Sequence, residues 1–370
     1  MVDADTGPRE EAFVRARTAI LGLVDRAFGP ESNPPLEDLF TLLDHAISRR
    51  EYYLGEPWNV LENVRRNFSL ALMFAINRAT DRAPRTARTF YRSLAADLLD
   101  QRLAAHQKGD PFSFILVNWD CLLENSLYWC LREAGGFRRA DVDYCCYTSP
   151  LDVTSPHQPS ILQRALGIFN IKVIKLHGST NWLLCPNCNR MYTGLGGNHE
   201  QQHSYVVPQY CPKCSPGGAS GAEEGGVGSP ELTPFLITPT FLKVFDNPHI
   251  QTSWHNAQIE LAEAARVVFI GYSLPQADYH FRTLLRRAIR GDINVEVVLT
   301  PADRPARNCP RVARPAYAAY RYAEFFGEDR LTIHLQGTEG YFRPVVARDS
   351  LKGKLERLRR RFGHLPAPRN

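Results

Sequence analysis

The sequence of 370 residues lacks any long hydrophobic run. A helix that crosses a bilayer needs about 20 apolar residues in succession, and no stretch of about 18 occurs, so we predict no membrane span. The opening residues, MVDADTGPREE, are acidic and polar and lack the apolar core of a secretory signal. We therefore expect a cytoplasmic protein without a membrane partner, built as one large domain with one or two modules.

The chain also has little excess charge, since its formal net charge is +5 and its pI is about 8.7. This charge is too small and too scattered to indicate nucleic acid, which we regard as an unlikely partner. One basic cluster occurs in residues 350–363, where Leu351, Leu355, Leu358 and Phe362 recur at helical spacing. A terminal helix with a solvated basic face is the favoured interpretation, and contact with a partner or a phosphate backbone is the alternative.

A disulfide framework is absent as well. Four of the nine cysteines form two C-P-x-C pairs, Cys185 with Cys188 and Cys211 with Cys214, and the other five are scattered. Each pair lets two thiolates reach one ion from a tight turn, and two pairs complete a tetrahedral four-sulfur zinc site. Because all four positions are filled, the predicted zinc is structural. A redox dithiol, coincidental cysteines and a zinc ribbon that binds nucleic acid are weaker alternatives.

The first hundred residues are predicted to be helical. Apolar residues recur at helical spacing, and Gly-Pro or Pro-containing segments separate the helices. The predicted helices cover residues 9–28, 35–53, 60–80 and 84–105. No catalytic spacing occurs in region 9–105, which we interpret as a helical cap or packing layer.

Short apolar runs alternate with helices after residue 110. The predicted strands are 111–118, 171–176, 235–238, 266–270 and 295–300, with 329–336 as a further edge strand. Strands alternating with helices are typical of an α/β fold with a doubly wound, Rossmann-like parallel sheet. We expect this domain to be discontinuous, over 110–182 and 234–345, with a Gly- and Ser-rich zinc-binding module inserted at 183–233.

Polar residues follow three of these strands. Asn118 and Asp120 follow the first, His177 with a glycine behind it follows the second, and Gly271 and Ser273 follow the fourth. The carboxyl ends of parallel strands form the ligand-binding edge of such sheets, and a histidine of near-neutral pKa is suited to act as a general base. Each feature has a structural alternative, because an Asn-x-Asp often caps a helix, a lone histidine is usually structural, and a Gly-x-Ser can be an ordinary turn.

The ordered combination of these motifs resembles the sirtuin superfamily, in particular its divergent bacterial sirtuin-like branch. The similar stretches span roughly 111–300, about half of the chain. They read FILVNWDCLLE, IKLHGSTNWLLCPNC, YCPKC, LITPTF and VVFIGYSLPQADYHFRTLL.

This resemblance implies an NAD⁺-binding domain that cleaves the nicotinamide–ribose bond. It implies that Asn118 and Asp120 lie near the nicotinamide and its ribose, that His177 is the base that engages the ribose hydroxyls, and that Gly271 and Ser273 line the adenosine side. Attack by an acyl-lysine oxygen of a protein gives deacylation, whereas attack by water gives NAD⁺ hydrolysis. The branch is linked to phage defence through NAD⁺ depletion, so we favour hydrolysis or a related transfer. Whether the protein forms a homo-oligomer is left open by the sequence.

The chain departs from the family at one motif. The family begins with a strand and a G-A-G-x-S loop whose backbone N–H groups approach the pyrophosphate, and no G-x-G occurs here before residue 100. We therefore expect the sequence to begin inside a longer reading frame or to be truncated. The second hypothesis for function is a non-catalytic sensor or scaffold that binds NAD⁺ or a related nucleotide; an enzyme is favoured.

Overall fold

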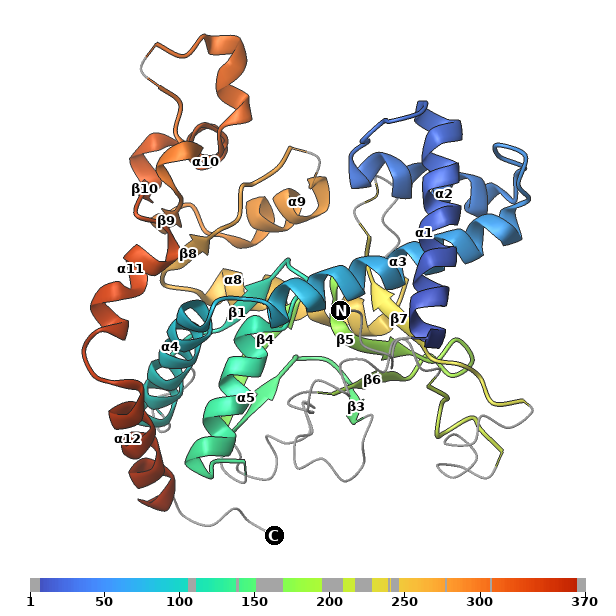
Figure 1. The fold of residues 1–370 in the computed structure, drawn as a ribbon. Coiled ribbons are helices and arrows are strands. Elements are labelled where there is room, and N and C mark those ends of the chain that lie inside the picture. Colours follow the sequence, from blue (N-terminus) through green and yellow to red (C-terminus); the bar gives the residue numbers. More distant parts are fainter. Residues whose placement is uncertain are drawn as a thin grey trace.

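The computed structural model has an α/β architecture with parallel sheets and many helices (Figure 1). No helix in the described part of the chain is long and apolar enough to cross a membrane. The described residues are 7–105, 111–137, 140–150, 169–194, 209–216, 228–238, 240, 246–276, 278–306 and 308–364.

The four predicted helices at the beginning of the chain are confirmed. They are α1 (Gly7–Phe28), α2 (Leu36–Arg49), α3 (Trp58–Asp81) and α4 (Arg85–Ala104). Prolines at 35, 57 and 84 each precede a helix, where a missing N–H costs nothing. Helix α2 ends four residues before its predicted end, because Arg50 adopts a left-handed conformation with φ 54° and its N–H bonds the carbonyls of Ala46 and Ile47.

Six parallel strands form two three-stranded sheets. One has the order β1-β4-β2 and the other the order β10-β9-β8. The pattern therefore correctly predicted parallel strands, but the pairing among the described residues gives two sheets where it predicted one. The strands are β1 (Phe114–Leu116), β2 (Ala140–Asp143), β4 (Phe169–Lys175), β8 (Val267–Ile270), β9 (Val295–Val298) and β10 (Leu331–His334).

Strand β4 is buried on both faces, and its alternating side chains contribute to two hydrophobic cores. Ile171 and Val173 pack with residues of α4, α5 and the last helix, α12. Ile174 and Leu176 pack on the other face with α8, α9, β8 and β9. This second core therefore contains residues of both parallel sheets. The other α-helices of the described residues are α5 (Leu122–Ala134), α8 (Pro248–Glu263), α9 (Tyr279–Ala288), α10 (Ala318–Phe326), α11 (Gly337–Val346) and α12 (Leu351–His364).

The third sheet is mainly antiparallel. Its order is β3-β6-β5-β7, with β5 antiparallel to both β6 and β7. The predicted strand at 235–238 is therefore a strand, but it lies in this sheet and not among the parallel strands. A bend at residues 176–177 leads from β4 into β5, the strand of this sheet that begins at Gly178. Its strands are β3 (Ser149–Pro150), β5 (Gly178–Leu184), β6 (Met191–Thr193) and β7 (Thr233–Leu236).

The basic helix α12 is packed against the molecule. It buries an apolar face consisting of Leu355, Leu358 and Phe362. Its Lys354 is also buried, with Nζ 2.5 Å from an oxygen of Asp97 on α4, and Arg361 pairs with Asp100 one turn further along α4. Lys354 is therefore neutralised inside the fold, whereas Arg361 is paired at its partly exposed edge.

Candidate metal centre and strand-end site

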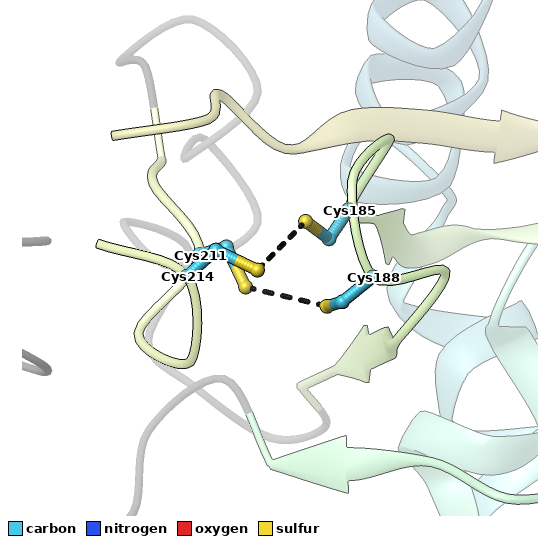
Figure 2. Close-up of side chains that lie close together, drawn as sticks. All are labelled: Cys185, Cys188, Cys211 and Cys214. Carbon is cyan, nitrogen blue, oxygen red and sulfur yellow. Dashed lines mark hydrogen bonds between the residues drawn. The ribbon is translucent and has the colours of Figure 1, made fainter. Parts of the chain in front are cut away.

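The four paired cysteines lie together at the ends of two tight turns. In the first turn, Cys185 follows β5 directly, and its carbonyl accepts the N–H of Asn189 at 3.0 Å. In the second turn, the carbonyl of Cys211 accepts the N–H of Cys214 at 3.2 Å and that of Ser215 at 3.0 Å. Each turn thus directs two sulfurs to the same side, and Figure 2 shows the two pairs facing one another.

The arrangement of these sulfurs fits a tetrahedral zinc ion. All four Sγ atoms lie within 4.8 Å of one another. Facing sulfurs are 3.9 Å apart for Cys185 and Cys214 and 3.8 Å apart for Cys188 and Cys211. A zinc ion with Zn–S bonds of about 2.3 Å in a tetrahedron separates its sulfurs by about 3.8 Å. Four thiolates would fill the coordination sphere, so a metal held here is structural.

Hydrogen bonds favour a thiolate at one position of this cluster. Although burial opposes it, hydrogen bonds from the Tyr192 hydroxyl and from backbone N–H groups lower the pKa of Cys211 to about 7. The hydroxyl oxygen of Tyr192 lies 3.2 Å from Cys211 Sγ. In contrast, the neighbouring sulfur of Cys188 raises the pKa of Cys214 to about 12. A divalent cation removes this conflict, because it stabilises all four thiolates at once.

His177 lies where β4 ends and the third sheet begins. The side chain is 8% exposed, and its Nδ1 is 3.3 Å from the carbonyl oxygen of Val117, directly after β1. Trp254 of α8 lies beside it, with ring centroids 6.2 Å apart, and donates its indole N–H to the carbonyl of Leu176 at 2.9 Å. The imidazole is therefore held at the carboxyl ends of two adjacent parallel strands.

Gly178 is required by the close approach of β7. Its φ is +78°, a conformation that other residues rarely adopt. A Cβ atom at this position would lie 2.3 Å from the carbonyl oxygen of Phe235. Next to this position, the N–H of Ile237 donates a hydrogen bond of 2.9 Å to the carbonyl of His177. The His-Gly pair is thus a backbone junction between sheets as well as a place for an imidazole.

The helical region reaches the same edge. Arg65 of α3 donates a hydrogen bond of 3.1 Å to the hydroxyl of Thr238, the residue that follows Ile237. The same arginine pairs with Asp44 of α2. Helices α2 and α3 are therefore tied to the segment that pairs with His177, which agrees with the interpretation of this region as a packing layer.

The turn at 118–120 lies against His177 and the start of β5. Asn118 is exposed, whereas the carbonyl of Trp119 accepts the N–H of Thr180 at 2.8 Å. Asp120 Oδ1 accepts the N–H of Leu122 at 3.1 Å, so its carboxylate binds the first residue of α5 from just before the N-cap residue, Cys121. The structural alternative for Asp120 is thus realised, while Asn118 stays open to solvent.

A buried ion pair between Lys175 and Glu124 lies next to the 118–120 turn, and the sequence analysis did not identify it. Lys175 and Glu124 have fully buried side chains, with Nζ 3.0 Å from Oε1. Burial raises the pKa of Glu124 against the opposing effect of Lys175. Burial also raises the pKa of the adjacent Cys121 thiol to about 11, so this cysteine is not a nucleophile at neutral pH. The available signal was a lysine within the apolar strand IKVIKL.

The turn at Gly271–Ser273 is held by another element. Ser273 is exposed, and its carbonyl accepts two hydrogen bonds from the guanidinium of Arg321 on α10, at 2.9 and 2.8 Å. Tyr322, the next residue of α10, donates to the carbonyl of Tyr272 at 2.9 Å. This turn follows β8 in the second parallel sheet, whereas His177 and the 118–120 turn follow strands of the first.

No protein-family model matches this chain, and no curated protein matches its sequence significantly.

Proposed function

We propose that this chain cleaves the nicotinamide–ribose bond of NAD⁺, with hydrolysis as the favoured reaction. The observation that carries the proposal is the placement of a buried imidazole, His177, at 3.3 Å from the end of the neighbouring parallel strand. Ligands bind at this edge of parallel sheets. The sirtuin-like resemblance of the same segments supplies the substrate, and we extend the proposal to a Rossmann-like NAD⁺-binding domain.

The reaction places modest demands on the side chains. The C1′–N1 bond breaks, its electron pair leaves with the nicotinamide nitrogen, and the leaving group departs neutral without an acid. Water adds to C1′ and releases one proton, so the products are nicotinamide, ADP-ribose and H⁺. Neutral His177 would accept a proton from water or from a ribose hydroxyl. Asn118 and the Asp120 carboxylate would orient the ribose and stabilise its developing positive charge.

The cysteine cluster would support this edge without taking part in the chemistry. A zinc ion bound there supplies a closed, structural site. Strand β5 starts at the residue after His177 and ends at the residue before Cys185. In addition, His249 of α8 contacts the carbonyl of Asn189 in the first cysteine turn, with its Nε2 at 2.9 Å from the oxygen. We propose that the metal module fixes the far end of β5 and thereby the course of the chain at His177.

The proposal is tested by measuring nicotinamide release from NAD⁺. We expect release by the unaltered chain and a decrease of roughly 10²- to 10⁴-fold in His177→Ala, the usual range for loss of a general base. His255→Ala, which alters an exposed histidine of α8, is the matched control and should release nicotinamide normally. Adding an acetyl-lysine peptide distinguishes the reactions, since deacylation requires it and hydrolysis does not. Equal release from the unaltered chain and His177→Ala would remove His177 from the mechanism.

A nucleotide sensor is the second candidate, and one observation favours it. Asp120 Oδ1 is engaged by the backbone N–H of Leu122, so the carboxylate already has a structural role. Under this alternative, calorimetry would detect binding of NAD⁺ or ADP-ribose while nicotinamide release stays at the uncatalysed rate. Release by the unaltered chain above that rate would reject the sensor.

A further inference from the structure

Lys175 occupies a position where the pattern of its strand calls for an apolar side chain. Alternate residues of β4 face the same way, and Ile171 and Val173 direct their side chains into the core with α4 and α5. Lys175 continues this row and meets Glu124 of α5 at 3.0 Å, with neither side chain exposed. A buried ion pair is weak evidence for stability, because well-packed apolar residues often stabilise a fold equally well.

Lys175 makes a second contact that an apolar residue would lose. Its Nζ donates to the backbone carbonyl of Asp120 at 2.5 Å. Since an ammonium group has three donors, it can hold Glu124 and this carbonyl simultaneously. Glu124 supplies the negative charge that lets the ammonium stay buried, and Lys175 fixes the backbone of the 118–120 turn from below.

The other side of the turn is fixed by β5. The carbonyl of Trp119 accepts the N–H of Thr180 at 2.8 Å and the hydroxyl of Ser179 at 3.3 Å. Cys121 Sγ lies 3.3 Å from the same hydroxyl of Ser179. The turn is therefore held by Lys175, two residues before His177 in the sequence, and by Ser179 and Thr180, two and three residues after it.

We propose that Lys175, neutralised by Glu124, is a positioning residue that holds Asn118 and Asp120 in register with His177. The catalytic part of this inference rests on the function proposed above, whereas the positioning itself does not. Lys175 acts through the carbonyl of Asp120, so its replacement should loosen the turn even where the fold stays stable.

The test separates positioning from stability by removing both charges together. In Lys175→Met/Glu124→Leu, no charge is left buried, so thermal unfolding should stay close to that of the unaltered chain. The amides of Thr180 and Leu122 bond Trp119 and Asp120 of the 118–120 turn. Their hydrogen exchange should nevertheless accelerate at least tenfold, and kcat for nicotinamide release should decrease by roughly 10- to 100-fold with a smaller change in KM. Glu124→Asp, which retains a carboxylate for Lys175 and its bond to the Asp120 carbonyl, should keep the exchange of these two amides as slow as in the unaltered chain.

The chain contains a matched control. Lys354 and Asp97 form another buried ion pair, between α12 and α4. Lys354→Met/Asp97→Leu should leave both the exchange of the Thr180 and Leu122 amides and kcat unchanged. If Lys175→Met/Glu124→Leu does not fold, Lys175→Met/Glu124→Gln gives the same comparison with an uncharged partner retained. Unchanged exchange of the Thr180 and Leu122 amides in a folded variant without Lys175 would overturn the inference. Absent nicotinamide release by the unaltered chain would reject the proposed function alone.

Discussion

The metal module and the parallel-sheet region hold themselves together by different means. We define the module as residues 183–194, 209–216 and 228–232. Its buried apolar cluster consists of Leu183, Cys185, Tyr192, Cys211 and Leu232, and thus includes two of the predicted metal ligands. The parallel strands and their helices bury two much larger cores. A cluster as small as that of the module contributes little stability, so a metal held by the four cysteines would supply most of it.

The buried polar groups of the two regions differ in the same way. In the module, four thiols face one another and need an external cation to become thiolates together. In the parallel-sheet region, Lys175 and Glu124 neutralise each other. A metal held by the module would be a component from outside the chain, whereas the charges of Lys175 and Glu124 balance without one. Loss of the metal should therefore leave the two large cores folded, although it frees the far end of β5.

Removal of the metal should have the largest effect. We expect one zinc ion per chain by elemental analysis, and its loss in Cys185→Ser/Cys211→Ser, because only two ligands remain. The module should lose most of the roughly 10 kcal/mol or more that a structural zinc site contributes to local folding. Limited proteolysis should then cleave rapidly within 185–194 and 209–216, while amides of β4 and α5 stay protected from hydrogen exchange.

The control for this experiment is Cys309→Ser, which alters a cysteine outside the cluster. It should retain the zinc and resist cleavage like the unaltered chain. Retention of a full zinc equivalent by Cys185→Ser/Cys211→Ser would contradict the assignment of the ligands. Global unfolding on metal loss would contradict the separation of the two regions.

Lys175→Met should have the next largest effect, and it should act on the parallel-sheet region alone. The substitution leaves the Glu124 carboxylate buried without its partner, at a cost of about 3–5 kcal/mol in the free energy of unfolding. Urea denaturation followed by circular dichroism measures this change, and zinc content should remain at one equivalent. A loss below about 1 kcal/mol would indicate that Glu124 is protonated in the native fold.

The same contrast explains what the sequence could and could not predict. The two cysteine turns were predictable because each pair is local, and a C-x-x-C spacing fixes the geometry of two ligands by itself. The strand ends were predictable as ends, because β-rich apolar runs stop at polar residues. The ion pair of Lys175 with Glu124 joins a strand to a helix from another part of the chain. Such a contact depends on the register of packing and not on spacing, so one sequence does not reveal it.

The prediction of which sheet contains residues 235–238 was wrong for a related reason. Residues 235–238 read as one more apolar strand, and nothing local distinguishes a strand of a parallel sheet from one of an antiparallel sheet. The deciding feature is the left-handed Gly178, which turns the chain out of β4 and brings β5 against β7. A glycine in a His-Gly pair permits this left-handed conformation, but the sequence alone does not predict that the glycine adopts it.

The two glycines at strand ends offer a third, smaller comparison. Gly178→Ala should cost about 2–4 kcal/mol, because a left-handed alanine is strained and its Cβ would lie 2.3 Å from the carbonyl oxygen of Phe235. Gly271 also has a positive φ, of +64°, but no heavy atom outside its immediate chain neighbours lies within 4 Å of a Cβ built there. Gly271→Ala should therefore cost only about 1–2 kcal/mol. Equal losses in urea denaturation would show that β7 moves aside.

The smallest effect concerns a charge at the surface of the second parallel sheet. Glu296 of β9 binds Arg266 at 2.5 Å and His334 at 3.0 Å. The hydrogen bond from Arg266 lowers the pKa of Glu296 to about 2, with His334 and Tyr341 contributing against the opposing effect of burial. Because the folded pKa lies below the unfolded value of 4.5, the carboxylate adds stability that is complete above about pH 4.5 and is lost as the pH falls towards 2.

This pH dependence separates a half-exposed network from the buried pair. Glu296→Gln should reduce the free energy of unfolding at pH 7 by about 1 kcal/mol, since water screens the exposed Arg266, and the difference from the unaltered chain should shrink steadily below pH 4.5. Urea denaturation at several pH values measures it, with Glu328→Gln, an exposed glutamate, as the control of equal charge. A difference that stays constant from pH 7 to pH 3 would show that the glutamine disrupts packing, because only an ionised carboxylate gives a contribution that disappears on protonation.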